Sequence, residues 1–192
     1  MSGKAKHTPA RKTAARRLPG DLDKDALIDR MLRVDHAGEY GARRIYEGQL
    51  AVLGRRPGAE TIREMLAQEE EHLAHFEALV VARRARPTAL QPLWHMAGFA
   101  LGAATAMLGE RAAMACTVAV EEVIEEHYAG QIAALGDDEA ELRDKLTAFR
   151  EDELEHRDVG LAHEAEDAPA YPALSAAIKS GSRLAIWLSE RL

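Results

Sequence analysis

The sequence has few residues of the kinds that stabilise disulfide-rich or sheet-rich proteins. Cys116 is the single cysteine among 192 residues, which excludes an intrachain disulfide and any zinc or iron–sulfur site built from cysteines. Aromatic residues make up 5% of the chain and apolar residues 47%, so small side chains dominate and favour closely packed helices over a sheet. No proline lies between residues 93 and 168, and no segment alternates regularly between apolar and polar residues. We therefore predict an all-α protein.

Acidic residues are absent from the first twenty positions, which contain six of the 25 lysines and arginines. Residues 21–192 therefore have 19 basic and 32 acidic side chains, a formal charge of −13. A domain this acidic is a poor partner for nucleic acid, so we expect none. Residues 1–20 lack the apolar run of a secretory signal. We expect them to form a basic, disordered tail, with a membrane-surface or targeting segment as the alternative.

Prolines and glycines divide the remaining chain, which we expect to be one domain, into stretches typical of helices. These stretches are 23–53, 58–85, 92–108, 111–135, 139–165 and 173–190. Gly54 and Gly136 stand at the ends of two of them, where a helix often ends on a residue with left-handed backbone geometry.

An internal repeat relates two parts of this domain. Residues 46–54 read Tyr-Glu-Gly-Gln-Leu-Ala-Val-Leu-Gly, and residues 128–136 read Tyr-Ala-Gly-Gln-Ile-Ala-Ala-Leu-Gly, at an offset of 82. A glutamate stands seven positions before each tyrosine, and a Glu-x-x-His motif follows each segment. The repeat predicts two similar helical hairpins, at about 23–85 and 111–165.

Acidic residues and histidines interrupt the apolar seams of these four helices. Each repeat supplies one isolated glutamate and one Glu-x-x-His pair: Glu39, Glu69 and His72 in the first, and Glu121, Glu153 and His156 in the second. No lysine or arginine lies on the seams. Burying one uncompensated carboxylate costs several kcal/mol, and a whole domain has only about 5–15 kcal/mol of stability. Four such carboxylates therefore need compensating cations.

The pattern satisfies the geometry of a dinuclear metal site. Residues three apart share a helix face, so the glutamate and histidine of each Glu-x-x-His can bind the same ion. A glutamate from each of two helices with a Glu-x-x-His from each of the other two is the ligand set of di-iron and di-manganese helical bundles. Ligation rich in oxygen with one imidazole per ion suits iron or manganese. We assign the six residues as metal ligands.

Three further polar residues lie on the same seams. Asp35 precedes Glu39 by one turn, and we expect it to orient a ligating imidazole, or else to form a hydrogen bond at the rim of the site. Tyr46 and Tyr128 occupy equivalent repeat positions. Either they close the core above the polar site, or one of them assists electron or proton transfer.

Residues 88–109 contain no charged side chain. We expect the helix at 92–108 to be an apolar helix at a membrane interface, with a buried core helix or a membrane span as alternatives. Gly98 and Gly102 form a pair suited to close helix contact. Trp187 and its apolar neighbours give the C-terminal helix a possible membrane or partner surface.

Several longer stretches are more specific than the metal motif. They are Val34-Asp-His-Ala-Gly-Glu-Tyr-Gly-Ala42, Arg86-Pro-Thr88, Pro92-Leu-Trp94, Gly98-Phe-Ala-Leu-Gly102, Ala113-Met-Ala-Cys-Thr-Val-Ala-Val-Glu-Glu122, Glu153-Leu-Glu-His156 and Leu188-Ser-Glu-Arg-Leu192. Through them, the chain from Ile28 to Leu192 resembles the demethoxyubiquinone hydroxylases of ubiquinone biosynthesis.

This resemblance implies a ferritin-like four-helix bundle with two iron ions. By the likeness, Glu39 binds one iron and Glu121 the other, Glu69 and Glu153 bridge them, and His72 and His156 each complete one iron. The implied reaction is hydroxylation of the ring of a polyprenylated demethoxyquinone, the penultimate step to ubiquinone, with O2 and NADH-derived electrons. Tyr128 matches a tyrosine near the electron-entry route.

The resemblance also implies a peripheral membrane protein, which we expect on the cytoplasmic face of a bacterial inner membrane or, alternatively, on the matrix side of the mitochondrial inner membrane. A homo-oligomer or a lipid-presenting partner protein fits this setting. Two other functions stay open. One is another ferritin-like di-metal redox enzyme, such as a peroxidase or catalase, and the other is a non-enzymatic bundle that binds iron or lipid.

Overall fold

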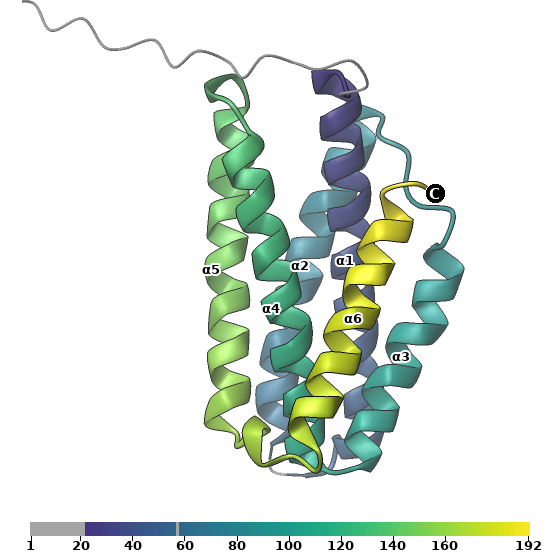
Figure 1. The fold of residues 1–192 in the computed structure, drawn as a ribbon, viewed down its shortest axis with the longest axis vertical. Coiled ribbons are helices and arrows are strands. Elements are labelled where there is room, and N and C mark those ends of the chain that lie inside the picture. Colours follow the sequence, from purple (N-terminus) through teal and green to yellow (C-terminus); the bar gives the residue numbers. More distant parts are fainter. Residues whose placement is uncertain (1–21, 57) are drawn as a thin grey trace, which may run out of the picture.

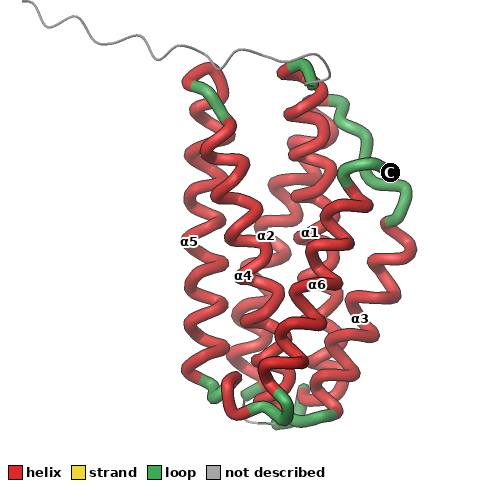
Figure 2. Tube along the Cα trace, viewed as in Figure 1, coloured by secondary structure: helices red, strands yellow, loops and turns green. Residues whose placement is uncertain are grey.

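The computed structural model describes residues 22–56 and 58–192, and the expected tail at 1–20 lies outside this range (Figure 1). The helices are α1 (Lys24–Leu53), α2 (Ala59–Arg83), α3 (Gln91–Met107), α4 (Glu110–Ala134), α5 (Ala140–Ala162) and α6 (Tyr171–Ser189), with short 3-10 turns η1 (Asp137–Glu139) and η2 (Ala165–Asp167). The described residues contain no strand (Figure 2). The prediction of an all-α protein is confirmed.

Four long helices form the bundle, and two shorter helices lie outside it. Helix α1 packs against α2, and α4 packs against α5, so each repeat forms one hairpin. Helix α3 packs along α1, and α6 packs along α4 (Figure 1). The molecule is therefore the ferritin-like four-helix bundle that we predicted, with the apolar helix and the C-terminal helix added on one side.

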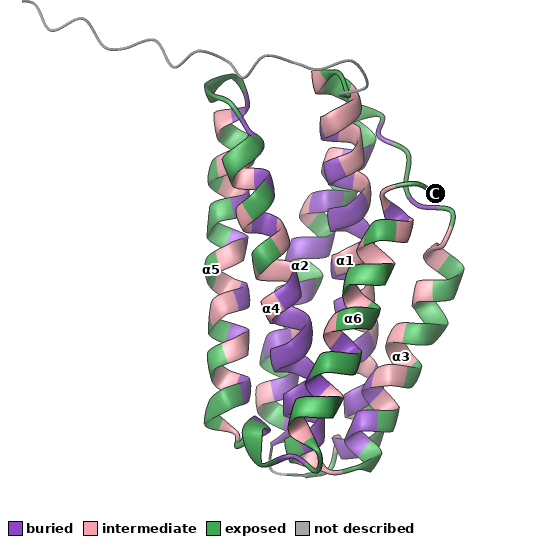
Figure 3. Cartoon of the chain, viewed as in Figure 1, coloured by how far each residue is buried: buried purple, intermediate pink, exposed green. Residues whose placement is uncertain are grey.

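The bundle interior has two apolar regions, as the seam pattern predicts. One contains Tyr46, Met65 and Met114, and the other contains Phe76 and Phe149. On each bundle helix, one buried glutamate lies between the segments that belong to or pack against these two regions: Glu39, Glu69, Glu121 and Glu153. Figure 3 shows buried residues along all four of these helices. The apolar side chains therefore enclose the polar residues from both ends of the bundle.

Glycines allow α3 to approach α1 closely. A Cβ atom on Gly102 would lie 1.9 Å from the carbonyl oxygen of Ile45, and one on Gly48 would lie 2.2 Å from that of Phe99. The expectation of close helix contact at Gly98 and Gly102 is confirmed, because a Cβ on Gly98 would also meet the backbone of α1, 2.9 Å from the oxygen of Gly41.

The structure corrects the expected helix ends. Gly54 has φ −58°, because its N–H still bonds to the carbonyl of Leu50 in helical geometry. Gly136 is extended, since α4 already leaves the helical path at Leu135. Left-handed residues instead follow α2 at Arg84, with φ 56°, and α5 at Glu164, with φ 59°.

Helix α3 is not a core helix, since only three of its 17 residues are buried. No helix in the described part of the chain combines the length and the hydropathy that crossing a bilayer requires.

Candidate metal centre

The six side chains assigned from the sequence meet at the middle of the bundle. Helices α1 and α4 each supply one glutamate, while α2 and α5 each supply a glutamate and a histidine one turn later. All six are buried, and none is more than 3% exposed. The 3.6-residue period places these polar groups on the faces that the flanking apolar residues direct inward.

The six residues form two overlapping groups. Glu39, Glu69, His72 and Glu153 bring one ligand atom each within 4.8 Å of one another, and Glu69, Glu121, Glu153 and His156 do the same. Glu69 and Glu153 belong to both groups. Two positions that share two carboxylates have the arrangement of a carboxylate-bridged dinuclear site.

Both imidazole rings direct Nδ1 toward the carboxylates. His72 Nδ1 lies 3.4 Å from Glu39 Oε2 and 3.3 Å from Glu153 Oε1. His156 Nδ1 lies 3.1 Å from Glu69 Oε1 and 3.5 Å from Glu153 Oε2. Each Nδ1 lone pair is thus available to an ion that the carboxylate oxygens also reach.

The donor atoms themselves test whether metal ions fit this site. Among the described residues, eight buried atoms of the six side chains have no hydrogen-bond partner, namely both histidine Nδ1 atoms and six carboxylate oxygens. Buried polar atoms without partners are rare and costly. Cations between the carboxylates would satisfy all of them, and a set of carboxylates with imidazole suits iron or manganese.

The acid groups also affect one another's protonation. Burial, followed by the nearby charge of Glu153, raises the pKa of Glu69 and of Glu121 well above the ordinary value. Burial opposes ionisation of Glu153 too, but its close contacts with His156 and His72 outweigh burial and lower its pKa to about 2. Burial opposes the charged form of His72, but its contacts with Glu153 and Glu39 raise its pKa to about 11. Without metal, the cluster therefore holds protons that metal binding must displace.

Two tyrosines cross-link the repeats at the site. The Tyr46 hydroxyl donates to Glu121 Oε1 at 2.7 Å, and the Tyr128 hydroxyl donates to Glu39 Oε1. Each tyrosine therefore holds the isolated glutamate of the other repeat, with one carboxylate oxygen left for another partner.

Sequence reasoning missed the two residues that form hydrogen bonds with Nε2 of each imidazole, the nitrogen that faces away from the glutamates. His72 Nε2 lies 3.0 Å from Asp152 Oδ2, and His156 Nε2 lies 2.8 Å from Gln68 Oε1. Asp152 and Gln68 each directly precede a Glu-x-x-His motif and are related by the same offset of 84. That repeated position was the available signal.

The contacts of Asp35 favour one of its two expected roles. Its carboxylate accepts a hydrogen bond of 2.6 Å from Gln131 Nε2 on α4, and its Oδ1 lies 3.6 Å from His127 Nε2. In the described part of the chain it makes no hydrogen bond or ion pair with His72 or His156, so its contacts fit the alternative that we also expected, a hydrogen bond outside the ligand set. Burial raises the pKa of Asp35 well above its usual value.

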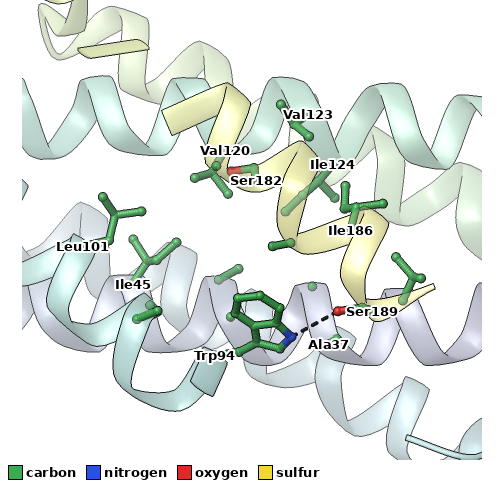
Figure 4. A pocket seen from close by; sticks show the side chains of 18 residues that line it. Ala37, Ile45, Trp94, Leu101, Val120, Val123, Ile124, Ser182, Ile186 and Ser189 are labelled. Carbon is green, nitrogen blue, oxygen red and sulfur yellow. Dashed lines mark hydrogen bonds between the residues drawn. The ribbon is translucent and has the colours of Figure 1, made fainter. Parts of the chain in front are cut away.

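An apolar groove of about 330 Å³ lies outside the bundle, between α3 and α6. Its floor includes Gly38 and Ala42 of α1 and Val120 of α4, which are close in sequence to the buried glutamates of those helices. Figure 4 shows Trp94 and Ser189 linking α3 to α6 beside the groove, where Trp94 Nε1 donates to Ser189 Oγ at 3.0 Å. Sequence reasoning gave the apolar helices but not the space between them.

Comparisons with known proteins agree over almost the whole chain. Residues 26–189 match the family model described as ubiquinone biosynthesis protein COQ7. The chain is 64% identical over 187 residues to the 3-demethoxyubiquinol 3-hydroxylase of Rhodospirillum rubrum, covering 97% of this chain and 88% of the relative. It is 56% identical to the mitochondrial NADPH-dependent 3-demethoxyubiquinone 3-hydroxylase of Homo sapiens, over 87% and 79% of the two chains. It is 40% identical to the mitochondrial 5-demethoxyubiquinone hydroxylase of Saccharomyces cerevisiae, over 87% and 79%.

Proposed function

The chain belongs to the ubiquinone biosynthesis protein COQ7 family, the demethoxyubiquinone hydroxylases, and from this premise we propose that it hydroxylates its substrate's ring at a di-iron centre. The product is the precursor that requires one further step to become ubiquinone. In the balanced reaction, a ring C–H becomes C–OH, the second atom of O2 becomes water, and two electrons and two protons are consumed.

The observation that carries this proposal is the sharing of Glu69 and Glu153 between the two buried groups. In this proposal Glu39 and His72 complete one iron position, and Glu121 and His156 complete the other. Bound iron would activate O2 for ring hydroxylation and pass on the electrons that the external donor provides. The chain's own contribution is to fix the donors on rigid helices and to exclude water with the apolar regions on both sides.

Tyr128 is proposed to assist proton or electron transfer at this site. Its hydroxyl donates to Glu39, so it holds a proton directly beside a proposed iron ligand. Asp35 has no contact with either ligating histidine. Its proposed contribution is therefore to hold α1 against α4 through Gln131, one turn away from Glu39.

The groove between α3 and α6 is the proposed position of the quinone. Its lining is almost entirely apolar, and its glycines and alanines leave room for a flat ring and the first part of a polyprenyl chain. Its floor belongs to α1 and α4, the two helices that provide Glu39 and Glu121. A quinone there would lie against the backbone that carries these two ligands.

The electrons are proposed to come from a reduced nicotinamide. The sequence resemblance suggested NADH, whereas the human relative is named for its dependence on NADPH. Comparing the two donors at equal concentration with the purified chain decides between them.

We further propose peripheral attachment to a membrane, in a bacterium at the cytoplasmic face of the inner membrane. Large exposed apolar side chains concentrate on α3, on α6 and on the residues that follow them: Leu93, Met96, Met107, Leu108, Leu184, Trp187 and Leu192. Helices α3 and α6 also form two walls of the groove, so a quinone could pass from the bilayer without crossing water. The same face is available to a second copy of the chain or to a lipid-presenting protein.

Iron content measured together with hydroxylation tests this function. We expect about two irons per chain and O2-dependent hydroxylation of a short-chain demethoxyquinone, with a reduced nicotinamide as donor. Glu153→Ala and Glu39→Ala should lose bound iron and activity while keeping their helical content. Glu155→Ala, an exposed change on the same helix, should retain both.

Other outcomes would identify the alternatives. Peroxide consumption without quinone hydroxylation would favour a peroxidase or catalase, and many irons per chain in a hollow multimer would favour storage. Full hydroxylase activity in the Glu153→Ala variant would rule out the proposed centre.

A further inference from the structure

We propose that Asp152 and Gln68 make the two metal positions unequal, so that the position at His72 takes up the first divalent cation. The inference rests on the proposed di-metal centre and concerns the order in which its two positions fill. It assigns positioning roles to two residues that lie outside the ligand set.

The geometry behind the proposal is nearly symmetric. Asp152 lies on α5 and contacts His72 of α2, while Gln68 lies on α2 and contacts His156 of α5. In both cases Nδ1 faces the glutamates and Nε2 faces the outer partner, at 3.0 Å and 2.8 Å. Each ring is therefore fixed in one orientation by a residue of the opposite hairpin, and its Nε2 carries the proton that this contact uses.

The two sides differ in the chemical group that contacts Nε2 of each histidine. Asp152 offers a carboxylate, whereas Gln68 offers a neutral amide oxygen. A hydrogen bond to a carboxylate is charge-assisted and roughly twice as strong as one between neutral groups. It also draws the Nε2 proton away from the ring, which makes the metal-binding nitrogen a better donor. His72 is therefore the stronger ligand of the two.

The other contacts of the site do not produce this difference. Glu69 and Glu153 are shared by both positions. Each isolated glutamate accepts one hydrogen bond from a tyrosine. In the part of the chain that the structure describes, His72 is the only ion-pair partner of Asp152, so no arginine or lysine neutralises its charge.

Asp35 is a second departure from the repeat symmetry, because Thr117 stands at the equivalent position. Its hydrogen bond goes to Gln131 and not to either imidazole. Removing its charge tests whether any acid near the site has the same effect. Asp35→Asn is therefore the matched control for Asp152→Asn.

The test is a titration of metal-free protein with Co²⁺ without oxygen, followed by its visible absorption. For the unmodified chain we expect two steps, the first about 10–100-fold tighter, which is the usual effect of an outer hydrogen-bond partner on metal affinity. Asp152→Asn should weaken the first step by a similar factor and bring the two steps together. Gln68→Glu should strengthen the second step, and the double variant should reverse the order. Asp35→Asn should leave two steps in the original order.

Proton NMR of the cobalt-loaded protein identifies which position fills first. The exchangeable ring N–H of a cobalt-bound histidine gives a strongly shifted signal, and at half loading we expect one such signal. At full loading, where both positions are occupied, Asp152→Asn should move the signal that appears first in the unmodified chain, and Gln68→Glu should move the other signal. Circular dichroism and thermal melting of each metal-free variant check that the helices and the fold persist.

The outcomes separate this inference from the proposed function. If the unmodified chain binds no cobalt in the bundle, the metal centre itself is wrong. If it binds two ions with equal constants, or if both shifted signals grow together at every loading, the two positions are not ordered and only this inference fails. An equal effect of Asp35→Asn and Asp152→Asn would show that nearby charge, rather than the contact with His72, sets the order.

Discussion

At the scale of single residues, the buried glutamates explain why this bundle is suited to bind cations. Glu69 and Glu121 are fully enclosed, and burial together with the charge of Glu153 raises their pKa values well above the ordinary range. The folded chain without metal therefore retains protons that the unfolded chain would release at neutral pH. A buried carboxylate without a compensating charge destabilises the fold. Because a divalent ion would provide that charge, the same carboxylate is a strong ligand for it.

The metal-free protein should become less stable as the pH rises from about 6 to 9. Glu69 and Glu121 have raised pKa values when folded, and the pKa of His72 rises from 6.5 to about 11. Their contributions to stability are therefore complete at low pH and decline as the pH rises. Glu153, with its pKa lowered to about 2, loses its contribution only in acid. Thermal melting in the presence of a chelator at several pH values measures this loss of stability. Each kcal/mol should lower the melting temperature by about 2–4 °C.

Metal should reverse this trend, because ligation requires deprotonated carboxylates and neutral imidazoles. The apparent affinity for iron should rise over the same range of pH, as measured by competition with a chelator. A melting temperature of the metal-free chain that increases between pH 6 and 9 would contradict the assignment of protons to this cluster.

At the scale of elements, the contact between α1 and α3 depends on glycine. Gly48 and Gly102 let the two backbones approach so closely that a Cβ atom would overlap a carbonyl oxygen. The buried residues of α3 are Gly102, Thr105 and Ala106, so its most enclosed contact lies in this short region. The position of α3, and with it one wall of the groove, is set by residues that have almost no side chain.

Gly102→Ala should therefore destabilise the protein by about 1–3 kcal/mol, the usual cost of overpacking. Because the overlap is with backbone, α3 must shift to relieve it, so the affinity for quinone should fall as well. Gly130→Ala is the matched control, because a Cβ there meets nothing within 4 Å, and alanine favours a helix by about 1 kcal/mol. Urea unfolding of both variants makes the comparison. Equal stability of the two would mean that α3 adapts without strain.

Filling the groove tests its role as the quinone site. Ala185 of α6 lines the groove, whereas Ala177 of the same helix is exposed. We expect Ala185→Trp to raise the KM for a short-chain demethoxyquinone about tenfold or more, since an indole occupies much of the volume. Iron content should not change. Ala177→Trp should behave like the unmodified enzyme, and equal KM values for both variants would place the substrate elsewhere.

At the scale of the whole molecule, the two helices outside the repeat distinguish one side of the bundle from the other. Two hairpins face each other across the metal centre, and the two added helices lie on the same side, along α1 and α4 (Figure 1). Most of the large exposed apolar side chains belong to these two helices or follow them directly. The molecule therefore has one apolar side that contains the groove.

This apolar side should bind lipid bilayers. Replacing Met96 and Trp187, which are 71% and 50% exposed, with glutamate should reduce co-sedimentation with anionic or neutral vesicles by about tenfold or more, because charge replaces apolar area at the interface. Val81→Glu, at an exposed apolar residue of α2, should have no such effect. Unchanged iron content would show that the loss is confined to the surface. Equal binding by all three proteins would contradict the proposed attachment.

The sequence by itself determined the helices, the two hairpins and the six residues that meet at the centre. Helical periodicity and an internal repeat are local properties, so they place Glu39 and Glu121, and both Glu-x-x-His pairs, on inward faces without knowledge of the packing. Only the tertiary structure decided which side chains from different helices touch. It paired His72 with Asp152 and His156 with Gln68 across the bundle, and it turned Asp35 toward Gln131 instead of an imidazole. These contacts, and the groove between α3 and α6, depend on how helices distant in sequence are rotated and spaced, and no single helix contains that information.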